Sequence, residues 1–296
     1  MAGTAPSTSP RVAIYWDGYT PPAYLTLCVT TWLSWVNIED ITVLNQTNAR
    51  YFVGDQIPTK YLKMYSYALQ SDAVSAAYLT KFGGTFIDAD TIMCSDNCLR
   101  FFEIGDADTK DVLRAFGFPP NRGIHIGALT SNPGGTVVAE WTRQLRERLP
   151  RWSEEYKWNF LGNAILDPYI RKPEILPHLD IIDAAATLST PEVQLATLPT
   201  VAGNASEEKK PPAQSRYEKY LQFWYQRSRS EADFVTIEQE SSGIISLHNS
   251  WTPPEYRNKS KDDILADSVT PLSRFLRRHA QPECFDEVEE LLIYGS

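Results

Sequence analysis

The 296-residue chain has few of the residues on which several common kinds of site depend. It contains four cysteines and four histidines, and among the cysteines only Cys94 and Cys98 lie close together. Because a zinc site needs a second pair or histidines at ligand spacing, we expect no zinc site. Reduced structural thiols are the favoured state of the cysteines, with a local disulfide as the alternative in an oxidising compartment.

Basic residues and long apolar runs are also scarce. Lys and Arg number 28 against 37 Asp and Glu, which gives a formal net charge of -9. Since phosphate-backbone binding needs a clustered basic face, we expect no nucleic-acid partner. The best apolar run, Ala23 to Val36, is shorter than the roughly 20 residues that cross a bilayer. Residues 1–10 lack the features of a signal peptide, so a cytoplasmic location is expected, with a secretory or Golgi-lumen location as the alternative if an anchor is missing.

The first third of the chain alternates between short apolar runs and helical patterns. Strands are predicted at Arg11 to Trp16, Ile41 to Leu44 and Thr85 to Ile87, and helices at Ala23 to Val36 and Lys60 to Phe82. This order predicts an α/β fold, a Rossmann-like mixed and mostly parallel sheet flanked by helices. In such sheets ligands bind beyond the carboxyl ends of the strands.

The remaining chain continues the same pattern. Further strands are predicted at residues 112–116, 124–129, 181–182, 193–198, 234–237 and 243–247, and helices at 134–149, 152–170 and 262–279. A loop or insertion boundary is predicted at residues 202–215. We therefore expect a disordered tail over residues 1–10, one domain over 11–260 and a helical C-terminal tail over 261–296 that packs on it.

The stretch from Ser71 to Met93 carries the strongest chemical signal. An apolar helical run ends at Gly83-Gly84, a short strand follows, and Asp88 and Asp90 stand one residue apart at its end. Two carboxylates so placed can hold one Mg²⁺ or Mn²⁺, which would neutralise the charge of a diphosphate leaving group. Asp90 would coordinate the cation, and Asp88 would touch it while accepting from a ribose hydroxyl. A solvated turn is the alternative.

A second candidate cluster is His248-Asn249-Ser250-Trp251, which follows the predicted strand at 243–247. As a neutral imidazole, His248 could complete a metal's coordination. Asn249, Ser250 and Trp251 Nε1 could donate to phosphate oxygens. The alternative is a structural histidine.

Two further residues have open interpretations. Asp72 lies on the predicted helix before the strand. It faces solvent, pairs with Lys81 or Lys63, or accepts from sugar hydroxyls. Trp16, at the end of the first strand, is either a core residue or a platform for a nucleobase. The other histidines, His125, His178 and His279, have no partner at a useful spacing and are expected to be structural.

At these residues the chain resembles the GT-A glycosyltransferases that use sugar nucleotides. The resemblance is to the DXD-containing sugar-binding-region and capsular-polysaccharide-synthesis families, distantly related to the glucosylating bacterial toxins. It depends on Ser71-Asp72, on the run from Lys81 to Asp90 and on His248 to Trp251. It implies a GT-A fold, a UDP-hexose or similar donor, Mn²⁺ or Mg²⁺, and retaining transfer to a glycan or lipid-linked glycan acceptor in polysaccharide biosynthesis.

The resemblance also implies a role for each matching residue. The metal ligands would be Asp88, Asp90 and His248, the donor contacts would be Trp16, Asp72, Asp88, Asn249, Ser250 and Trp251, and the catalytic residues would be Asp72 and Asp90. Relatives often carry an Arg three residues after the helix Asp, where this chain has Ser75. That departure leaves the donor, and activity itself, open.

Three other interpretations remain. Asp88 and Asp90 also resemble the nucleophile and general acid of haloacid-dehalogenase-type phosphatases, although Ile92 stands where those enzymes carry Thr or Val. A non-catalytic protein that binds a sugar nucleotide or glycan is the second, and Ser75 favours it. Finally, Arg274, Arg277 and Arg278 form a basic face that predicts either a peripheral contact with an anionic membrane or a solvated helix.

Overall fold

The computed structural model describes residues 11–17, 19–64, 66–103, 111–117, 123–153, 157, 159–183, 216–226 and 230–295. These residues form a six-stranded sheet in the order β2-β1-β3-β6-β5-β7 and a two-stranded sheet of β4 and β8. The strands are β1 (Val12–Tyr15), β2 (Ile41–Leu44), β3 (Gly84–Ile87), β4 (Thr91–Met93), β5 (Leu113–Gly117), β6 (Ile124–Ser131), β7 (Leu179–Asp183) and β8 (Ile244–Ser246).

The large sheet is mostly parallel, as predicted. The pairs β1–β2, β1–β3 and β5–β7 are parallel, and β6 runs antiparallel to both β3 and β5. The small sheet is antiparallel and pairs Thr91 with Ser246. The fold is therefore α/β with one reversed strand, and β3 lies at the centre of the large sheet.

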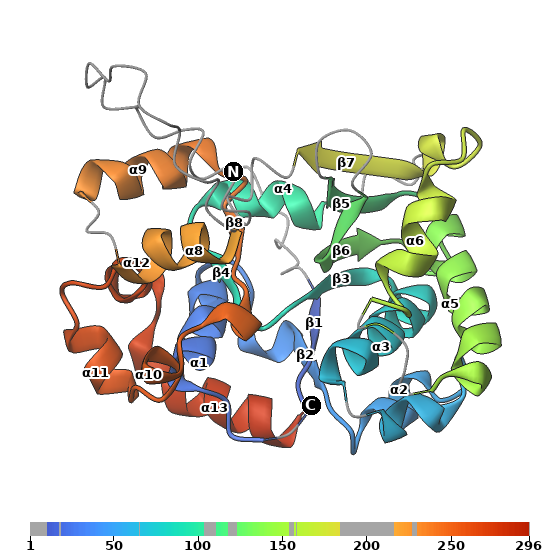
Figure 1. The fold of residues 1–296 in the computed structure, drawn as a ribbon, viewed down its shortest axis with the longest axis horizontal. Helices are drawn as coiled ribbons and strands as arrows, with labels where there is room; N and C mark the ends of the chain where they lie inside the picture. The colour runs from blue at the N-terminus through green and yellow to red at the C-terminus, as the bar shows by residue number, and fades with distance from the viewer. Residues whose placement is uncertain are drawn as a thin grey trace, which may run out of the picture.

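Helices cover both faces of the large sheet (Figure 1). On one face lie α3 (Tyr67–Phe82), α5 (Thr136–Arg148) and α6 (Asn163–Ile170), whose side chains share a core with Phe86 and Leu129 of the sheet; the short helix α2 (Ala49–Val53) joins the same core. Ser66 caps α3 by accepting from Leu69 N. The helix ends at Gly83, whose φ of 64° favours glycine, and the chain turns directly into β3.

The other face shares a core with Val29 of α1 (Ala23–Thr30), Phe101 and Val288. The helices from the C-terminal part of the chain pack mainly around α1 and the small sheet (Figure 1). These are α8 (Arg216–Leu221), a π-helix (Gln222–Gln226), α9 (Glu231–Glu240), α10 (Pro254–Arg257), α11 (Lys261–Ala266), α12 (Pro271–His279) and α13 (Phe285–Tyr294). Their side chains share one core with Leu27 of α1 and Ile245 of β8. The C-terminal region is thus helical, as predicted. The remaining helix is α4 (Leu99–Phe102).

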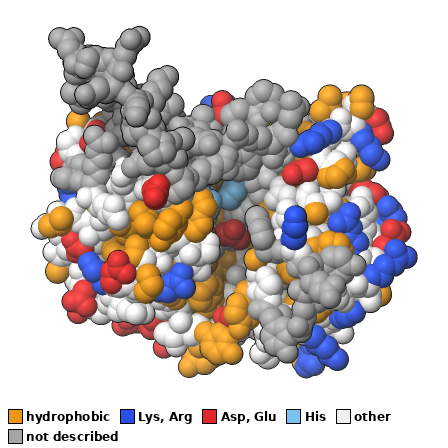
Figure 2. All heavy atoms as spheres, in the orientation of Figure 1, with side chains coloured by type: hydrophobic (Ala, Val, Ile, Leu, Met, Phe, Trp, Pro, Cys, Tyr) orange, Lys and Arg blue, Asp and Glu red, His pale blue; other side chains and the backbone are white. Residues whose placement is uncertain are grey.

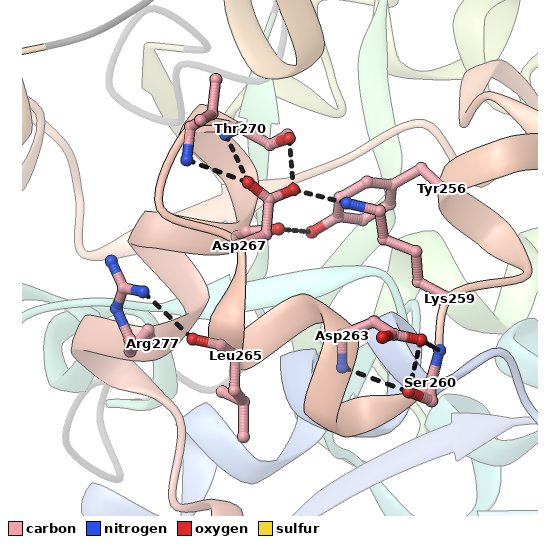
Figure 3. A network of polar contacts seen from close by, with 10 residues as sticks. Tyr256, Lys259, Ser260, Asp263, Leu265, Asp267, Thr270 and Arg277 are labelled. Carbon is pink, nitrogen blue, oxygen red and sulfur yellow. Dashed lines mark hydrogen bonds and ion pairs between the residues drawn. The ribbon is translucent and has the colours of Figure 1, made fainter.

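A polar network fixes the turn between α11 and α12 (Figure 3). Asp267 accepts from the backbone N–H groups of Val269 and Thr270 at 2.9 Å, from the Thr270 hydroxyl at 2.6 Å and from the ammonium group of Lys259. Burial opposes ionisation of Asp267, but these bonds outweigh it and hold its pKa below the usual range. Ser260 and Asp263 form a capping box at the start of α11.

The strand predicted at residues 234–237 is wrong, because these residues lie within α9. Ser230 accepts from Asp233 N, and Asp233 in turn accepts from Ser230 N, which forms a capping box that starts the helix. Phe234 and Ile237 are three residues apart and both face the core, a helical rather than an alternating period.

Four predicted helices are shorter than expected. The one predicted at Ala23 to Val36 ends at Thr30, where a 3₁₀ turn over Thr31–Ser34 follows. Residues 59–63 form a 3₁₀ turn separated from α3, α6 begins only after Gly162, and the segment predicted at 262–279 is divided into α11 and α12 by the Asp267 turn. The predicted strand at 193–198 and the loop at 202–215 lie outside the described residues.

All four cysteines are free thiols, which agrees with the expected reduced state. Burial raises the pKa of both Cys94 and Cys98 to about 12, so neither thiol is activated.

In the part of the chain that the structure describes, no helix is long and apolar enough to cross a bilayer. On α12, Arg274 and Arg278 pair with Glu231 and Glu238 of α9. The predicted membrane contact stays a prediction, and most of the basic face that suggested it is used between helices.

Candidate active site

The two sheets meet at Asp88 and Asp90. Asp88 directly follows β3 of the large sheet, and its backbone N–H donates to Gly127 O of β6 at 2.8 Å. Asp90 directly precedes β4 of the small sheet; its carbonyl accepts from Leu247 N at 2.9 Å, and its Oδ2 accepts from Asn249 N at 2.6 Å. Both acids therefore have fixed backbones, and Asp90 also has a fixed carboxylate.

Asp72 of α3 joins this pair from the opposite side. Its side chain is nearly buried, and its Oδ2 atom has no hydrogen-bond partner. This oxygen faces Gly162 at the start of α6, where a Cβ atom would lie 2.5 Å from it. Asp72 is also close enough to Asp88 to raise the pKa of that carboxyl by repulsion. The structure thus brings three predicted acids to one place.

These three carboxylates lie in an environment that disfavours negative charge. Burial raises the pKa of Asp72 and, together with repulsion from Asp90 and Asp72, that of Asp88. Burial also raises the pKa of Asp90 to about 6, although the hydrogen bond from Asn249 N opposes the shift. Among the described residues, no Lys or Arg forms an ion pair with any of the three. Such a cluster is suited to an external cation.

His248 follows β8 and lies beside the acids. Its backbone N–H donates to the Tyr220 hydroxyl at 3.1 Å, and its ring packs on Trp251 with centroids 4.3 Å apart. Figure 2 shows a histidine and an acidic side chain in a hollow at the centre of one face, beside hydrophobic side chains on the side of α8. The predicted late motif and the predicted acids are therefore neighbours in space.

Asn249 has a role that the sequence did not indicate. Its backbone N–H is used by Asp90, its Oδ1 accepts from the Tyr24 hydroxyl, and its carbonyl accepts from the guanidinium of Arg257. A contact with phosphate would have to come from its Nδ2 group. Asn249 thus holds Asp90 in place, whereas Ser250 is exposed beside it.

Trp16 and Ser75 are also placed by the structure. The indole N–H of Trp16 donates to Tyr19 O at 2.6 Å, which fixes the ring at the end of β1, where it is half-buried. Ser75 is buried, and its hydroxyl donates to Asp72 O at 3.1 Å. It therefore supplies no charge to the site.

His125 has a partner that the sequence did not indicate, and its expected structural role stays a prediction. Its Nε2 atom lies 2.9 Å from Ser246 Oγ, and burial, together with repulsion from His248, lowers its pKa. Its partner is 121 residues away in the chain, so no local pattern could reveal the pair. Gly127 was missed as well, because what it supplies is the absence of a side chain. Gly162-Asn163 was predicted only as a candidate wall of the acceptor cleft, and its contact with Asp72 was not predicted.

The side chains that could ligate a metal at this site fit a hard divalent cation that binds together with a substrate. Within the described residues, no group of three or more His, Cys, Asp or Glu side chains is arranged to hold a metal by itself. Mg²⁺ is commonly held by one or two carboxylates together with substrate phosphates and water. Asp88 and Asp90 supply two carboxylates of this kind.

Comparisons with known proteins add little to this geometry. No family model matches the sequence, and no curated protein matches it. Among solved structures, the apo-form glycosyltransferase GlyE of Streptococcus pneumoniae TIGR4 is similar over 94% of this chain, with a TM-score of 0.46 and 14% sequence identity. The chain spans 62% of the length of that structure. Because this likeness is low, the functional proposal depends on the site of this chain alone.

Proposed function

We propose that this chain is a metal-dependent glycosyltransferase of the GT-A type. It would transfer a hexose from a nucleotide sugar, with a UDP-sugar favoured, to a glycan or lipid-linked glycan acceptor with retention at the anomeric carbon. The observation that supports the proposal is the convergence of Asp72, Asp88 and Asp90 without a Lys or Arg ion pair among the described residues. A divalent cation and a polyol donor supply the positive charge and the hydroxyl groups that these acids need.

Asp88, Asp90 and His248 would hold Mn²⁺ or Mg²⁺, which when bound neutralises the charge that develops on the leaving diphosphate. Asn249 N keeps the Asp90 carboxylate in one orientation. Ser250 and Trp251 Nε1 would donate to diphosphate oxygens, and the ring of Trp16 would stack on the base. The DXD pair thus binds the donor's charged part, and none of these residues is assigned as a nucleophile.

Asp72 would bind the sugar of the donor. Its unpartnered, buried Oδ2 is an acceptor whose hydrogen bond must come from outside the described residues, and a sugar hydroxyl supplies it. Because Ser75 is neutral and turned back onto the helix, no guanidinium grips the sugar from that position. Hydrogen bonding by Asp72 would therefore carry much of the sugar recognition.

Release of nucleoside diphosphate from a panel of UDP- and GDP-hexoses tests the proposal, with and without Mn²⁺ and with glycan acceptors present or absent. We expect Mn²⁺-dependent release from one donor, and a loss of about 100-fold or more in Asp88→Asn and Asp90→Asn. Asp96→Asn, at an exposed acid beyond the other end of β4 from Asp90, is the matched control.

Two results would contradict the proposal. Asp88-dependent hydrolysis of p-nitrophenyl phosphate without donor cleavage would indicate a phosphatase. Tight binding of one donor without any turnover would indicate a non-catalytic binding protein.

A further inference from the structure

The pairing of strand β6 with β5 is interrupted where β6 passes the acids. Its pairing with β5 joins Ala115 to Leu129 and then Phe116 to His125, so residues 126–128 have no counterpart on β5. On the other side β6 stays paired with β3, where Ile87 faces Ala128. A bulge of this kind bends a strand and redirects its side chains, and bulges are frequent beside active sites.

The bulge supports Asp88 directly. Gly127 O accepts from Asp88 N, and the Asp88 carboxylate lies over the Gly127 Cα atom. A Cβ atom on Gly127 would lie 2.5 Å from Asp88 Oδ2 and 2.8 Å from His125 Nε2. The Asp88 carboxylate and the His125 imidazole therefore both lie over Gly127, and they leave no room for a side chain at this position.

His125 also reaches the small sheet. Its Nε2 atom is 2.9 Å from Ser246 Oγ, so one hydrogen bond joins β6 of the large sheet to β8 of the small sheet. Ser246 is buried, pairs with Thr91 directly after Asp90, and is two residues from His248. The bond therefore lies between the part of the site that carries Asp88 and the part that carries Asp90 and His248.

Burial, with a contribution from His248, lowers the pKa of His125 to about 4. A hydrogen bond just outside the ligands, like the one from His125 to Ser246, orients the residues that hold a metal.

We propose that His125 is a positioning residue, whose hydrogen bond to Ser246 sets the spacing between Asp88 and the pair Asp90 and His248 so that all three meet one divalent cation. The inference rests on the proposed function, since it concerns the same metal and diphosphate. Loss of an outer-shell partner typically weakens metal affinity by 10–100-fold, which is the effect expected here.

The test is Mn²⁺ affinity measured by electron paramagnetic resonance in the presence and absence of UDP, on the full chain. His125→Leu and Ser246→Ala remove the same hydrogen bond from its two ends, and His125→Gln can restore it. His178→Leu is the matched control, because His178 hydrogen-bonds to the backbone oxygen of Asp111, away from Asp72, Asp88 and Asp90. Thermal unfolding midpoints are measured for every variant.

We expect His125→Leu and Ser246→Ala each to weaken Mn²⁺ binding in the presence of UDP by 10–100-fold, with His125→Gln weakened less. The double variant should be little worse than either single one, because both lose one shared interaction. Wild-type Mn²⁺ affinity in both single variants, whatever their unfolding midpoints, would overturn the inference. Absence of Mn²⁺ binding in the wild type with UDP and also with GDP would instead overturn the proposed function, and this inference with it.

Discussion

Two of the three acids lie against glycines, and this contact is the most specific feature of the site at the scale of residues. Asp88 lies over Gly127, and Asp72 faces Gly162. The pattern of strand and carboxylates predicted both acids at the end of a strand; Asp88 does directly follow β3, whereas Asp90 directly precedes β4. It could not predict the glycines or His125, because their contacts come from segments distant in the sequence.

Gly162→Ala tests the space beside Asp72. The new Cβ atom would lie 2.5 Å from both Asp72 Oδ2 and Ile126 Cδ1, so one of them must move. We expect about 1–3 kcal/mol of lost stability and a loss of donor cleavage of 10-fold or more. Denaturant unfolding and donor hydrolysis measure the two effects.

Gly117→Ala in β5 is the control, because its Cβ atom would collide with Ile181 away from the acids. It should cost similar stability and leave donor cleavage intact. Equal loss of cleavage in both variants would show that Gly162 acts only through stability.

Asp90 makes the folding stability of the protein depend on pH. Its pKa is raised to about 6, above the value of about 3.9 in an unfolded chain. Its contribution to stability is therefore complete below about pH 4 and is lost as the pH rises through 6. Asp90→Asn removes the charge but keeps an oxygen that can accept from Asn249 N. In EDTA at pH 7, we expect this variant to melt at a higher temperature than the wild type.

Thermal unfolding between pH 5 and 7 checks this prediction, with Asp96→Asn as the control. The advantage of Asp90→Asn should shrink toward pH 5, where the wild-type carboxyl is largely protonated. A variant that melts below the wild type at pH 7 would show that ionised Asp90 is not destabilising.

At the scale of elements, the turn after β8 is held by tyrosines from three helices. Tyr24 of α1 donates to Asn249, Tyr220 of α8 accepts from His248 N, and Tyr225 of the π-helix donates to Thr252. A π-helix at this place agrees with the frequent occurrence of such turns at functional sites. The sequence predicted the strand before this turn, but not the helices that hold it.

Tyr220→Phe tests this support. It removes the acceptor for His248 N and leaves a partly buried N–H unsatisfied, which costs about 1–3 kcal/mol. We expect lower stability together with weaker Mn²⁺ binding in the presence of UDP. Tyr256→Phe loses a buried hydroxyl that hydrogen-bonds to Ser273 Oγ at 2.9 Å, so it should lower stability alone. The same metal affinity in both variants would remove Tyr220 from the site's support.

Prediction of secondary structure from the sequence failed where the spacing of apolar residues fits both a helix and a strand. The apolar residues of 234–237 fit a short strand as well as a helix, and only the capping box at Ser230 and Asp233 separates the two. The strands of the large sheet were predicted well, because their apolar runs are bounded by turn residues. The three-residue strand β4 is too short to give a pattern, and it forms because β8 pairs with it.

At the scale of the whole molecule, the C-terminal helices share a hydrophobic core with the first helix, α1. Ile264, Leu272, Phe275, Leu276 and Phe285 are all buried in the cluster that contains Leu27 of α1. Each such side chain contributes about 1.5–3 kcal/mol when buried. Together they approach the whole stability of a typical domain, about 5–15 kcal/mol.

A chain that ends at Ser260 should therefore not fold. We expect it to lack a cooperative thermal transition and to be cleaved rapidly by protease, because the apolar face of α1 is uncovered. Circular dichroism and limited proteolysis measure this, with the full chain as the reference. A cooperative transition near the wild-type midpoint would instead show that residues 261–296 form a separable tail.

The measurement that tests the central claim most directly is isothermal titration of UDP and GDP into the full chain, with Mn²⁺ and with EDTA. The account predicts that one nucleotide binds the wild type only with Mn²⁺, and that Asp90→Asn abolishes this binding while Asp96→Asn preserves it. Binding that is equal in Mn²⁺ and EDTA, or the same in Asp90→Asn as in the wild type, would contradict it.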